Sequence, residues 1–201
     1  GGLVLLGSGS VSQYLKVHFE CEGLHDVCVK KLKTAICKSS FKLRTSRGCV
    51  ATKIVALPLC WCSHWGLVVH ARAGDGGRWR NYVLSSLRDY GQDALDERLR
   101  VYEEAWRQVS GVGPDEDIVW EHPVVLAQND AHSCGAHTAA FVEYLGAAIT
   151  KRGVTTQAIA DMLEYARYNG PVANAADDLW EYAVSFESDD AVRAALALRR
   201  P

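Results

Sequence analysis

The chain has 201 residues, 48% of them hydrophobic, and carries a formal net charge of −2. This length allows one domain to bury a core without help from disulfides or metal ions, and the charge gives no sign of a polyanion-binding surface. Charged residues interrupt the apolar runs far short of a membrane span, and the opening segment lacks the basic start of a secretory signal. We therefore expect neither a nucleic-acid partner nor a membrane segment.

The seven cysteines are odd in number and irregularly spaced, which argues against a disulfide framework. We expect an intracellular monomer without a cofactor, placed in the cytoplasm or nucleus or in an infected host cell. Ligands along one straight helix cannot surround a zinc ion tetrahedrally, so Cys and His residues at helical spacing favour a buried helix face over a metal site. These residues are His18, Cys21, His25 and Cys28, and the alternative is a two-ligand contribution completed by Cys37 or Cys49.

One helix and three strands are predicted in the first half of the chain. Residues 10–20 (SVSQYLKVHFE) place apolar side chains on one side of a helix, and residues 53–59 (KIVALPL) form a β-branched run typical of a buried strand. Two further strand-like runs, 64–72 and 78–86, flank AGDGG at 73–77. Such runs around a glycine-rich turn predict a β-hairpin.

The second half is mostly helical. Residues 93–106 (DALDERLRVYEEAW) predict an amphipathic helix, and residues 122–128 (HPVVLAQ) predict a short buried strand. A helix begins at Cys134, and helical stretches at about 155–168 and 175–198 follow. Helix, strands, helix, strand and helices in this order predict an α+β fold.

The stretch QNDAHSCG, residues 128–135, carries the candidate chemistry. Cys134 lies where a polar loop meets a helix, and a helix N-terminus favours the nucleophilic thiolate. His64 opens a strand and is a candidate base, while the Gln128 amide and the Cys134 backbone N–H are candidate donors to an oxyanion. Each feature alone also fits a buried structural cysteine or a core histidine.

Two segments, LPLCWCSHWGLVV and VVLAQNDAHSCGAH, together resemble the ubiquitin-like-protein-specific cysteine proteases, the superfamily of SUMO proteases and adenovirus protease. The resemblance covers about residues 53–147. It rests on a proline followed six residues later by His-Trp, and on a glutamine followed six residues later by Cys-Gly. The matching residues are Pro58, His64, Trp65, Gln128, Cys134 and Gly135. The resemblance implies a papain-like α+β fold of the SUMO-protease and adenain type, with a small central mixed sheet and the nucleophile at a helix N-terminus.

The same resemblance implies the roles of the site residues. Cys134 is the expected nucleophile, His64 the general base and Gln128 the oxyanion donor. Trp65 is the expected lid over a narrow tunnel that admits a Gly-Gly terminus, with Ser133 and Gly135 as further substrate contacts.

The chain departs from the family where an acid normally orients the histidine. If the hairpin turn centres near Asp75, position 64 lies opposite about 85 or 86, and Ser85 occupies the acid position. Asn81 would lie about four residues away, roughly 13 Å, and Asp89 requires the chain to fold back. We expect Ser85, or a water that it holds, to orient the histidine, with Asn81, Asp89 or no residue as alternatives. A hydroxyl in place of a carboxylate is expected to cost roughly 10²–10⁴ in rate.

The resulting hypothesis is one cysteine protease domain over residues 1–201, divided into a divergent part at 1–52, a catalytic core at 53–147 and helices at 148–201. It predicts cleavage after a Gly-Gly-like sequence in ubiquitin-like modifier conjugates (SUMO, ubiquitin or NEDD8) or in a viral polyprotein, since only 63 residues precede His64 and the substrate platform is short. Two alternatives remain: an effector-type acetyltransferase on the same Cys-His scaffold, and a weakly active or non-catalytic binder of ubiquitin-like tails.

Overall fold

The structure of the chain is a computed structural model. It describes residues 3–5, 29–30, 33–34, 54–72, 77–87, 91–113 and 116–171. The expected helices at 10–20 and 175–198, Asp89 and the Cys/His set between positions 18 and 28 lie outside these residues. Within the described part, no helix is long and apolar enough to cross a membrane.

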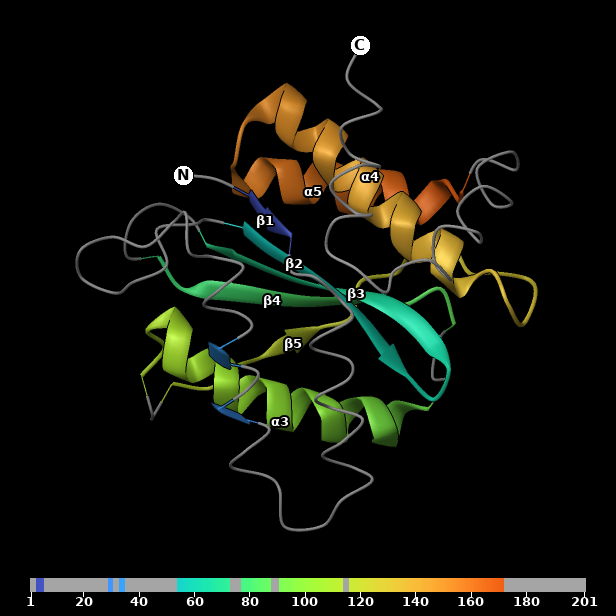
Figure 1. The fold of residues 1–201 in the computed structure, drawn as a ribbon. Coiled ribbons are helices and arrows are strands. Elements are labelled where there is room, and N and C mark those ends of the chain that lie inside the picture. Colours follow the sequence, from blue (N-terminus) through green and yellow to red (C-terminus); the bar gives the residue numbers. More distant parts are fainter. Residues whose placement is uncertain are drawn as a thin grey trace.

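A five-stranded mixed sheet forms the centre of the molecule, with its strands in the order β1-β2-β3-β4-β5 (Figure 1). The strands are β1 (Leu3–Leu5), β2 (Ile54–Trp61), β3 (His64–Arg72), β4 (Trp79–Leu84) and β5 (Trp120–Glu121). The three central strands pair antiparallel, while the two short edge strands run parallel to their neighbours.

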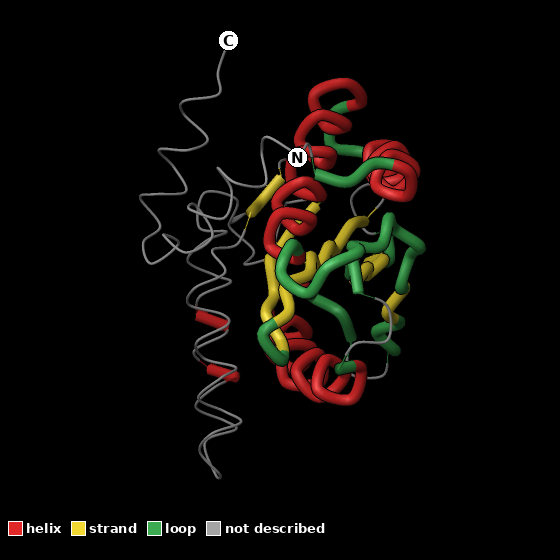
Figure 2. Tube along the Cα trace, turned by 90° about the vertical axis from the view of Figure 1, so that its right-hand side faces the viewer, coloured by secondary structure: helices red, strands yellow, loops and turns green. Residues whose placement is uncertain are grey.

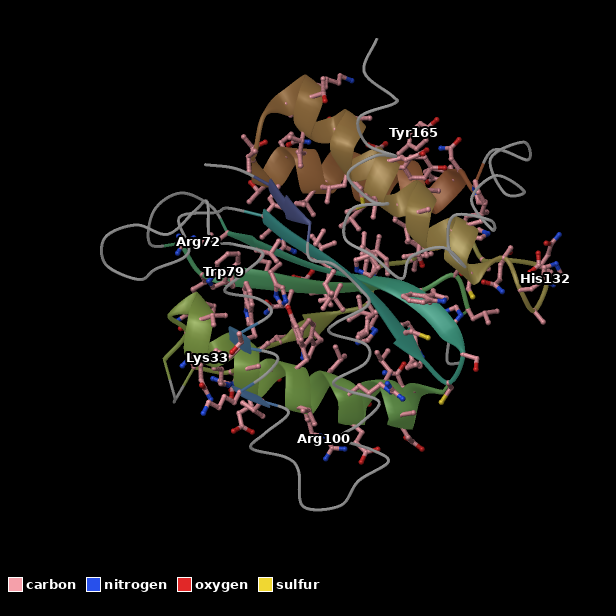
Figure 3. All side chains as sticks on the ribbon, viewed as in Figure 1. Lys33, Arg72, Trp79, Arg100, His132 and Tyr165 are labelled. Carbon is pink, nitrogen blue, oxygen red and sulfur yellow. The ribbon has the colours of Figure 1, made fainter. Side chains whose placement is uncertain are left out.

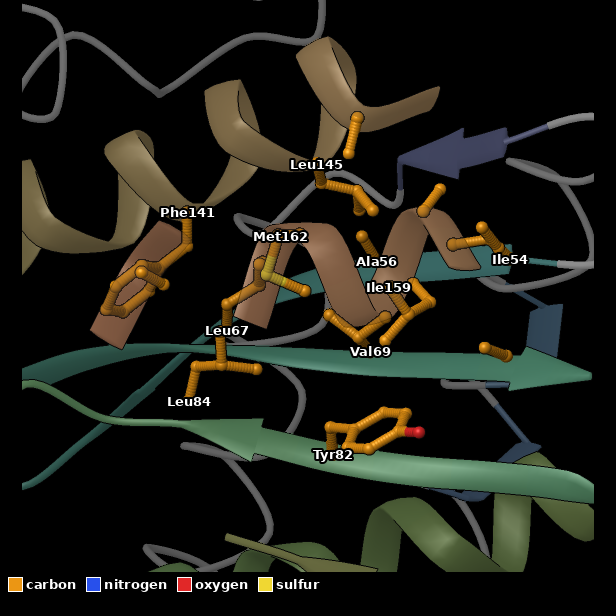
Figure 4. Close-up of a cluster of buried hydrophobic side chains, with 14 of the residues drawn as sticks. Ile54, Ala56, Leu67, Val69, Tyr82, Leu84, Phe141, Leu145, Ile159 and Met162 are labelled. Carbon is orange, nitrogen blue, oxygen red and sulfur yellow. The ribbon is translucent and has the colours of Figure 1, made fainter. Parts of the chain in front are cut away.

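Helices cover both faces of the sheet. The helix α3 (Gln92–Ser110) lies on one face, and α4 (Cys134–Arg152) and α5 (Thr156–Tyr168) lie on the other, so that the fold has three layers (Figures 1 and 2). Successive side chains of a strand point to opposite faces of the sheet. A sheet covered on both faces therefore needs apolar residues at nearly every strand position. This explains the continuous apolar run of β2, in which Val55 and Leu57 pack toward α3 while Ile54 and Ala56 pack toward α4 and α5 (Figure 4).

The structure confirms the α+β class, the strand near 53–59, the hairpin and the helix near 93–106. The predicted strand at 122–128 is wrong, because the strand pairing ends at Glu121. Pro123 has no N–H to give to a ladder, and the backbone N–H of Leu126 donates to the carbonyl of Ala166 in α5 at 2.8 Å. The chain therefore leaves the sheet for the helical layer.

Candidate active site

A two-residue turn joins β2 to β3 and places His64 at the start of β3. Both turn residues, Cys62 and Ser63, have positive φ, at 45° and 62°. A hairpin turn of this kind suits Asn and Gly, so two side chains with a Cβ here store backbone strain. The strained turn fixes the position from which the His64 side chain leaves the strand.

His64 is buried, with 1% of its surface exposed. The ring of Trp61 meets it edge-on with 4.8 Å between the ring centroids. Burial, and secondarily the neighbouring His137, lowers the pKa of His64 to about 4. His64 is therefore a neutral imidazole at neutral pH.

Ser85 lies just beyond β4 and fixes which nitrogen of His64 carries the proton. Its Oγ donates to the carbonyl of Leu87 at 2.6 Å and lies 2.9 Å from Nε2 of His64. A serine hydroxyl has one hydrogen, so an Oγ that gives it to Leu87 accepts a hydrogen bond from Nε2–H. A neutral ring then has its basic lone pair on Nδ1.

The strand register explains where the other candidate partner lies. Leu67 pairs with Leu84, which extrapolates to Leu87 opposite His64, one or two residues beyond the predicted position. The side chain of Ser85 still reaches the ring. Asn81 pairs with His70 at the far end of β3, and its Oδ1 lies 2.8 Å from Nδ1 of His70.

A short polar loop leads to Cys134, the first residue of α4. Oδ1 of Asp130 accepts from the backbone N–H groups of His132 and Ser133 at 2.8 and 2.7 Å, and these bonds lower the pKa of Asp130 to about 2. His132 marks this loop in Figure 3, beside the start of α4. The thiol of Cys134 is free and buried, with 5% of the residue exposed.

Gln128 is hydrogen-bonded to Ser86, the residue after Ser85. Its Oε1 accepts from the hydroxyl of Ser86 at 2.6 Å, its Nε2 donates to the carbonyl of Asp130 at 2.7 Å, and its backbone N–H donates to the carbonyl of Ser86 at 3.0 Å. The end of β4 therefore contacts both the candidate base and the candidate oxyanion donor.

The remaining predicted residues border this region. Trp65 is half-buried on β3 and pairs with Cys60 of β2. Burial raises the pKa of the Cys60 thiol, and the nearby Cys134 contributes to the shift. Ser133 and Gly135 are half-buried at the start of α4. Cys60 of β2 therefore lies near Cys134, and His64 of β3 lies near His137, three residues further along α4.

The sequence did not predict the contacts of His64 with Trp61, of Gln128 with Ser86, or of Ser85 with the Leu87 carbonyl. The serine doublet SSL at the end of β4 was the only available signal for Ser86, and a backbone carbonyl leaves no signal at all. No group of three Cys, His, Asp or Glu side chains suited to a metal ion occurs among the residues that the structure describes.

The fold defines the class to which the protein belongs. A cysteine at the head of a helix, packed against a small mixed sheet, is the arrangement of the papain-like α+β cysteine proteases. The model of the Ulp1 protease family, C-terminal catalytic domain, matches residues 29–167, and the chain belongs to this family.

Several solved structures resemble the chain at low sequence identity. A de-sumoylating protease is 14% identical, with 92% of this chain and 73% of that chain covered and a TM-score of 0.47. The XopD effector of Xanthomonas campestris, solved bound to ubiquitin, is 17% identical over 82% of this chain and 78% of its own, with a TM-score of 0.45. The Ulp1 protease domain in complex with Smt3, the yeast ortholog of SUMO, is 13% identical over 79% and 72%, with a TM-score of 0.44. No curated protein sequence matches the chain.

Proposed function

We propose that this chain is a thiol protease that cleaves after a Gly-Gly-like sequence, with a ubiquitin-like modifier conjugate or a polyprotein as its substrate. The observation that carries the proposal is the hydrogen-bond arrangement around His64. Ser85 holds Nε2–H, so the basic nitrogen of a neutral ring is Nδ1. Membership of the Ulp1 family supports Cys134 as the group from which that base takes a proton.

In this mechanism the Cys134 sulfur attacks the scissile carbonyl carbon while its proton moves to Nδ1 of His64. The carbonyl oxygen becomes an oxyanion, which accepts from the Gln128 side-chain amide and the Cys134 backbone N–H. The C–N bond then breaks, and His64 returns the proton to the leaving amine. Water hydrolyses the thioester, which releases the new carboxylate and the free thiol.

The serine at position 85 makes this protease slow. The proton transfer creates an imidazolium in a buried place where the pKa of His64 is lowered to about 4. A carboxylate stabilises that cation, whereas the hydroxyl of Ser85 only holds the tautomer. The proposal therefore includes a rate well below that of relatives with an acid at this position.

The test is covalent capture by carboxy-terminal electrophiles. Ubiquitin, SUMO, NEDD8 and short Gly-Gly peptides, each ending in a vinyl sulfone, are incubated with the protein, and adducts are read by intact mass and peptide mapping. We expect one modifier, or the peptides, to label Cys134. Labelling by one modifier names the substrate class, and labelling by peptides alone indicates polyprotein processing.

Two variants make the capture experiment specific. Cys134→Ala is expected to abolish labelling, while Cys62→Ala, which removes an exposed thiol of the β2–β3 turn, is expected to leave it unchanged. Full hydrolytic activity in Cys134→Ala overturns the proposal.

A second candidate function is a non-catalytic binder of ubiquitin-like tails. Ser85 at the position where the family carries an acid favours it, because a serine hydroxyl stabilises the charged form of the histidine less than a carboxylate does. The binder predicts capture by none of the electrophiles, a Cys134 that reacts with iodoacetamide no faster than an ordinary cysteine, and saturable binding of a modifier in isothermal titration.

A further inference from the structure

The two serines at the end of β4 reach in different directions. Ser85 contacts the ring of His64, whereas Ser86 contacts Gln128 through both its backbone and its side chain. Ser86 is buried, with 1% of its surface exposed, and Gln128 with 8%. The bond between Ser86 Oγ and Gln128 Oε1 is 2.6 Å long, so a buried hydroxyl is committed to one amide oxygen.

The amide of Gln128 is fixed at both ends. Its Nε2 faces the carbonyl oxygen of Asp130 at 2.7 Å. A flipped amide would bring two acceptor oxygens together there and would lose this partly buried hydrogen bond. The hydroxyl of Ser86 supplies the donor that the amide oxygen needs in the observed orientation.

In this orientation one N–H of the Gln128 amide is left to donate a hydrogen bond to an oxyanion. An amide NH₂ carries two hydrogens, and Asp130 takes one of them. The loop beyond Asp130 is itself fixed, since the carboxylate of Asp130 holds the N–H groups of His132 and Ser133 just before Cys134. The amide and the nucleophile are therefore carried by one short, internally bonded segment.

We propose that Ser86 is a positioning residue that holds the Gln128 amide with its NH₂ group presented to the oxyanion. The positioning itself is a property of the fold, while its effect on rate rests on the proposed function. Ser86 touches neither substrate nor reacting atoms in this proposal. It acts through Gln128, and it ties the oxyanion donor to the strand end that also orients His64.

The first measurement does not depend on activity. The chain has five glutamines, so selective ¹⁵N labelling gives a sparse set of side-chain NH₂ signals, and Gln128→Met assigns the one of interest. We expect Ser86→Ala to shift both Gln128 NH₂ protons and to raise their exchange with water at least tenfold. Ser110→Ala is the matched control, because it removes another buried hydroxyl, one that accepts from Val112 N–H at the end of α3, and leaves the Gln128 signals in place.

The second measurement uses hydrolysis of the substrate found by electrophile capture. Loss of one oxyanion donor costs about 10²–10³ in kcat, so a misaligned donor in Ser86→Ala is expected to lower kcat by about 10- to 100-fold with KM within about twofold. On a Gln128→Ala background, Ser86→Ala is expected to cost less than twofold, because the group that it positions is gone. A merely structural role would lower kcat equally on both backgrounds.

The isosteric pair Ser86→Thr and Ser86→Val keeps the test decisive if Ser86→Ala does not fold. The two variants have the same shape and differ in the hydroxyl, so Thr is expected to keep the Gln128 signals and the rate while Val loses both. Unchanged Gln128 signals in Ser86→Ala or Ser86→Val overturn the positioning role. Altered signals in a protein that hydrolyses no substrate overturn the proposed function alone.

Discussion

The two ends of β3 each carry a buried histidine, His64 at the start and His70 near the end, and the two rings are held as opposite tautomers. Oδ1 of Asn81 can only accept, so Nδ1 of His70 must donate to it across 2.8 Å. Nε2 of His70 then accepts from the hydroxyl of Tyr102 at 3.0 Å. At His64 the proton is on Nε2 instead, because the Ser85 hydroxyl accepts from it.

The surroundings of His70 are those of a structural residue. Its ring stacks on Trp106 with 3.8 Å between centroids and 13° between planes, and Trp79 and Trp120 close the cluster. Burial lowers the pKa of His70 to about 3 and raises that of Tyr102. Both nitrogens of His70 are committed to protein groups, so the ring is held in place.

The comparison of His64 with His70 shows that burial and a lowered pKa do not by themselves distinguish a candidate catalytic histidine from a structural one. Both rings are neutral at neutral pH, because burial is the largest cause of the lowered pKa of each. The location separates them. His64 follows a strained turn and lies near His137 in the first turns of α4, the helix that begins with Cys134, whereas His70 lies among tryptophans beside α3.

The largest expected effect comes from replacing the two histidines in turn. His64→Gln is expected to lower kcat by about 10³–10⁴, because the proposed general base is lost, and to change the free energy of unfolding by less than about 2 kcal/mol. His70→Ala is expected to lose about 3–5 kcal/mol of stability through a cavity in the aromatic cluster, while the folded fraction keeps its kcat. Urea unfolding and single-turnover hydrolysis measure both quantities. If folded His64→Gln and folded His70→Ala lose the same activity, the assignment of His64 as the base and of His70 as a structural residue is wrong.

The sequence could predict the start of β3 better than its end. The His-Trp and Gln-to-Cys-Gly spacings are local signals, and the hairpin pattern was enough to place Ser85 within reach of His64. The role of His70 could not be predicted, because its partners Asn81, Tyr102 and Trp106 come from other elements and meet only after the sheet and α3 have packed. The strand predicted at 122–128 failed for a similar reason, since α5 offers its backbone a competing partner.

The next expected effect is a fall in the free energy of unfolding as the pH is lowered. A histidine whose folded pKa is lowered takes up a proton on unfolding, so its contribution is complete above about pH 6.5 and falls as the pH drops toward the folded pKa. With folded values of about 4 for His64 and about 3 for His70, the loss is about 1.4 kcal/mol per pH unit for each ring, or roughly 2.5 kcal/mol each at pH 4.5.

Urea unfolding at a series of pH values between 7 and 4.5 measures this slope. The pKa values of Asp130 and Asp161 are also lowered, but these carboxylates contribute to acid unfolding mainly below the ordinary aspartate range. Burial lowers the pKa of His137 as well, so the slope in this window is the sum over three histidines and single substitutions separate them. His70→Gln is expected to reduce the number of protons taken up on unfolding by about one, and His64→Gln by about the same amount. A slope that neither substitution changes would mean that both rings are protonated in the folded protein.

The smallest expected effect is a gain in rate, and it follows from the serine at position 85. Ser85→Asp places a carboxylate near Nε2 of His64, where it favours the imidazolium and raises the pKa of the ring. We expect kcat/KM to rise about 10- to 100-fold, which is 1.4–2.7 kcal/mol of transition-state stabilisation, and the acid limb of the pH–rate profile to move upward from about pH 4. Ser85→Asn, which has the same shape without the charge, is the control and is expected to give no gain. If Asp and Asn behave alike, the slow step is not the formation of imidazolium, and the serine at this position is not what distinguishes this site from one with an acid.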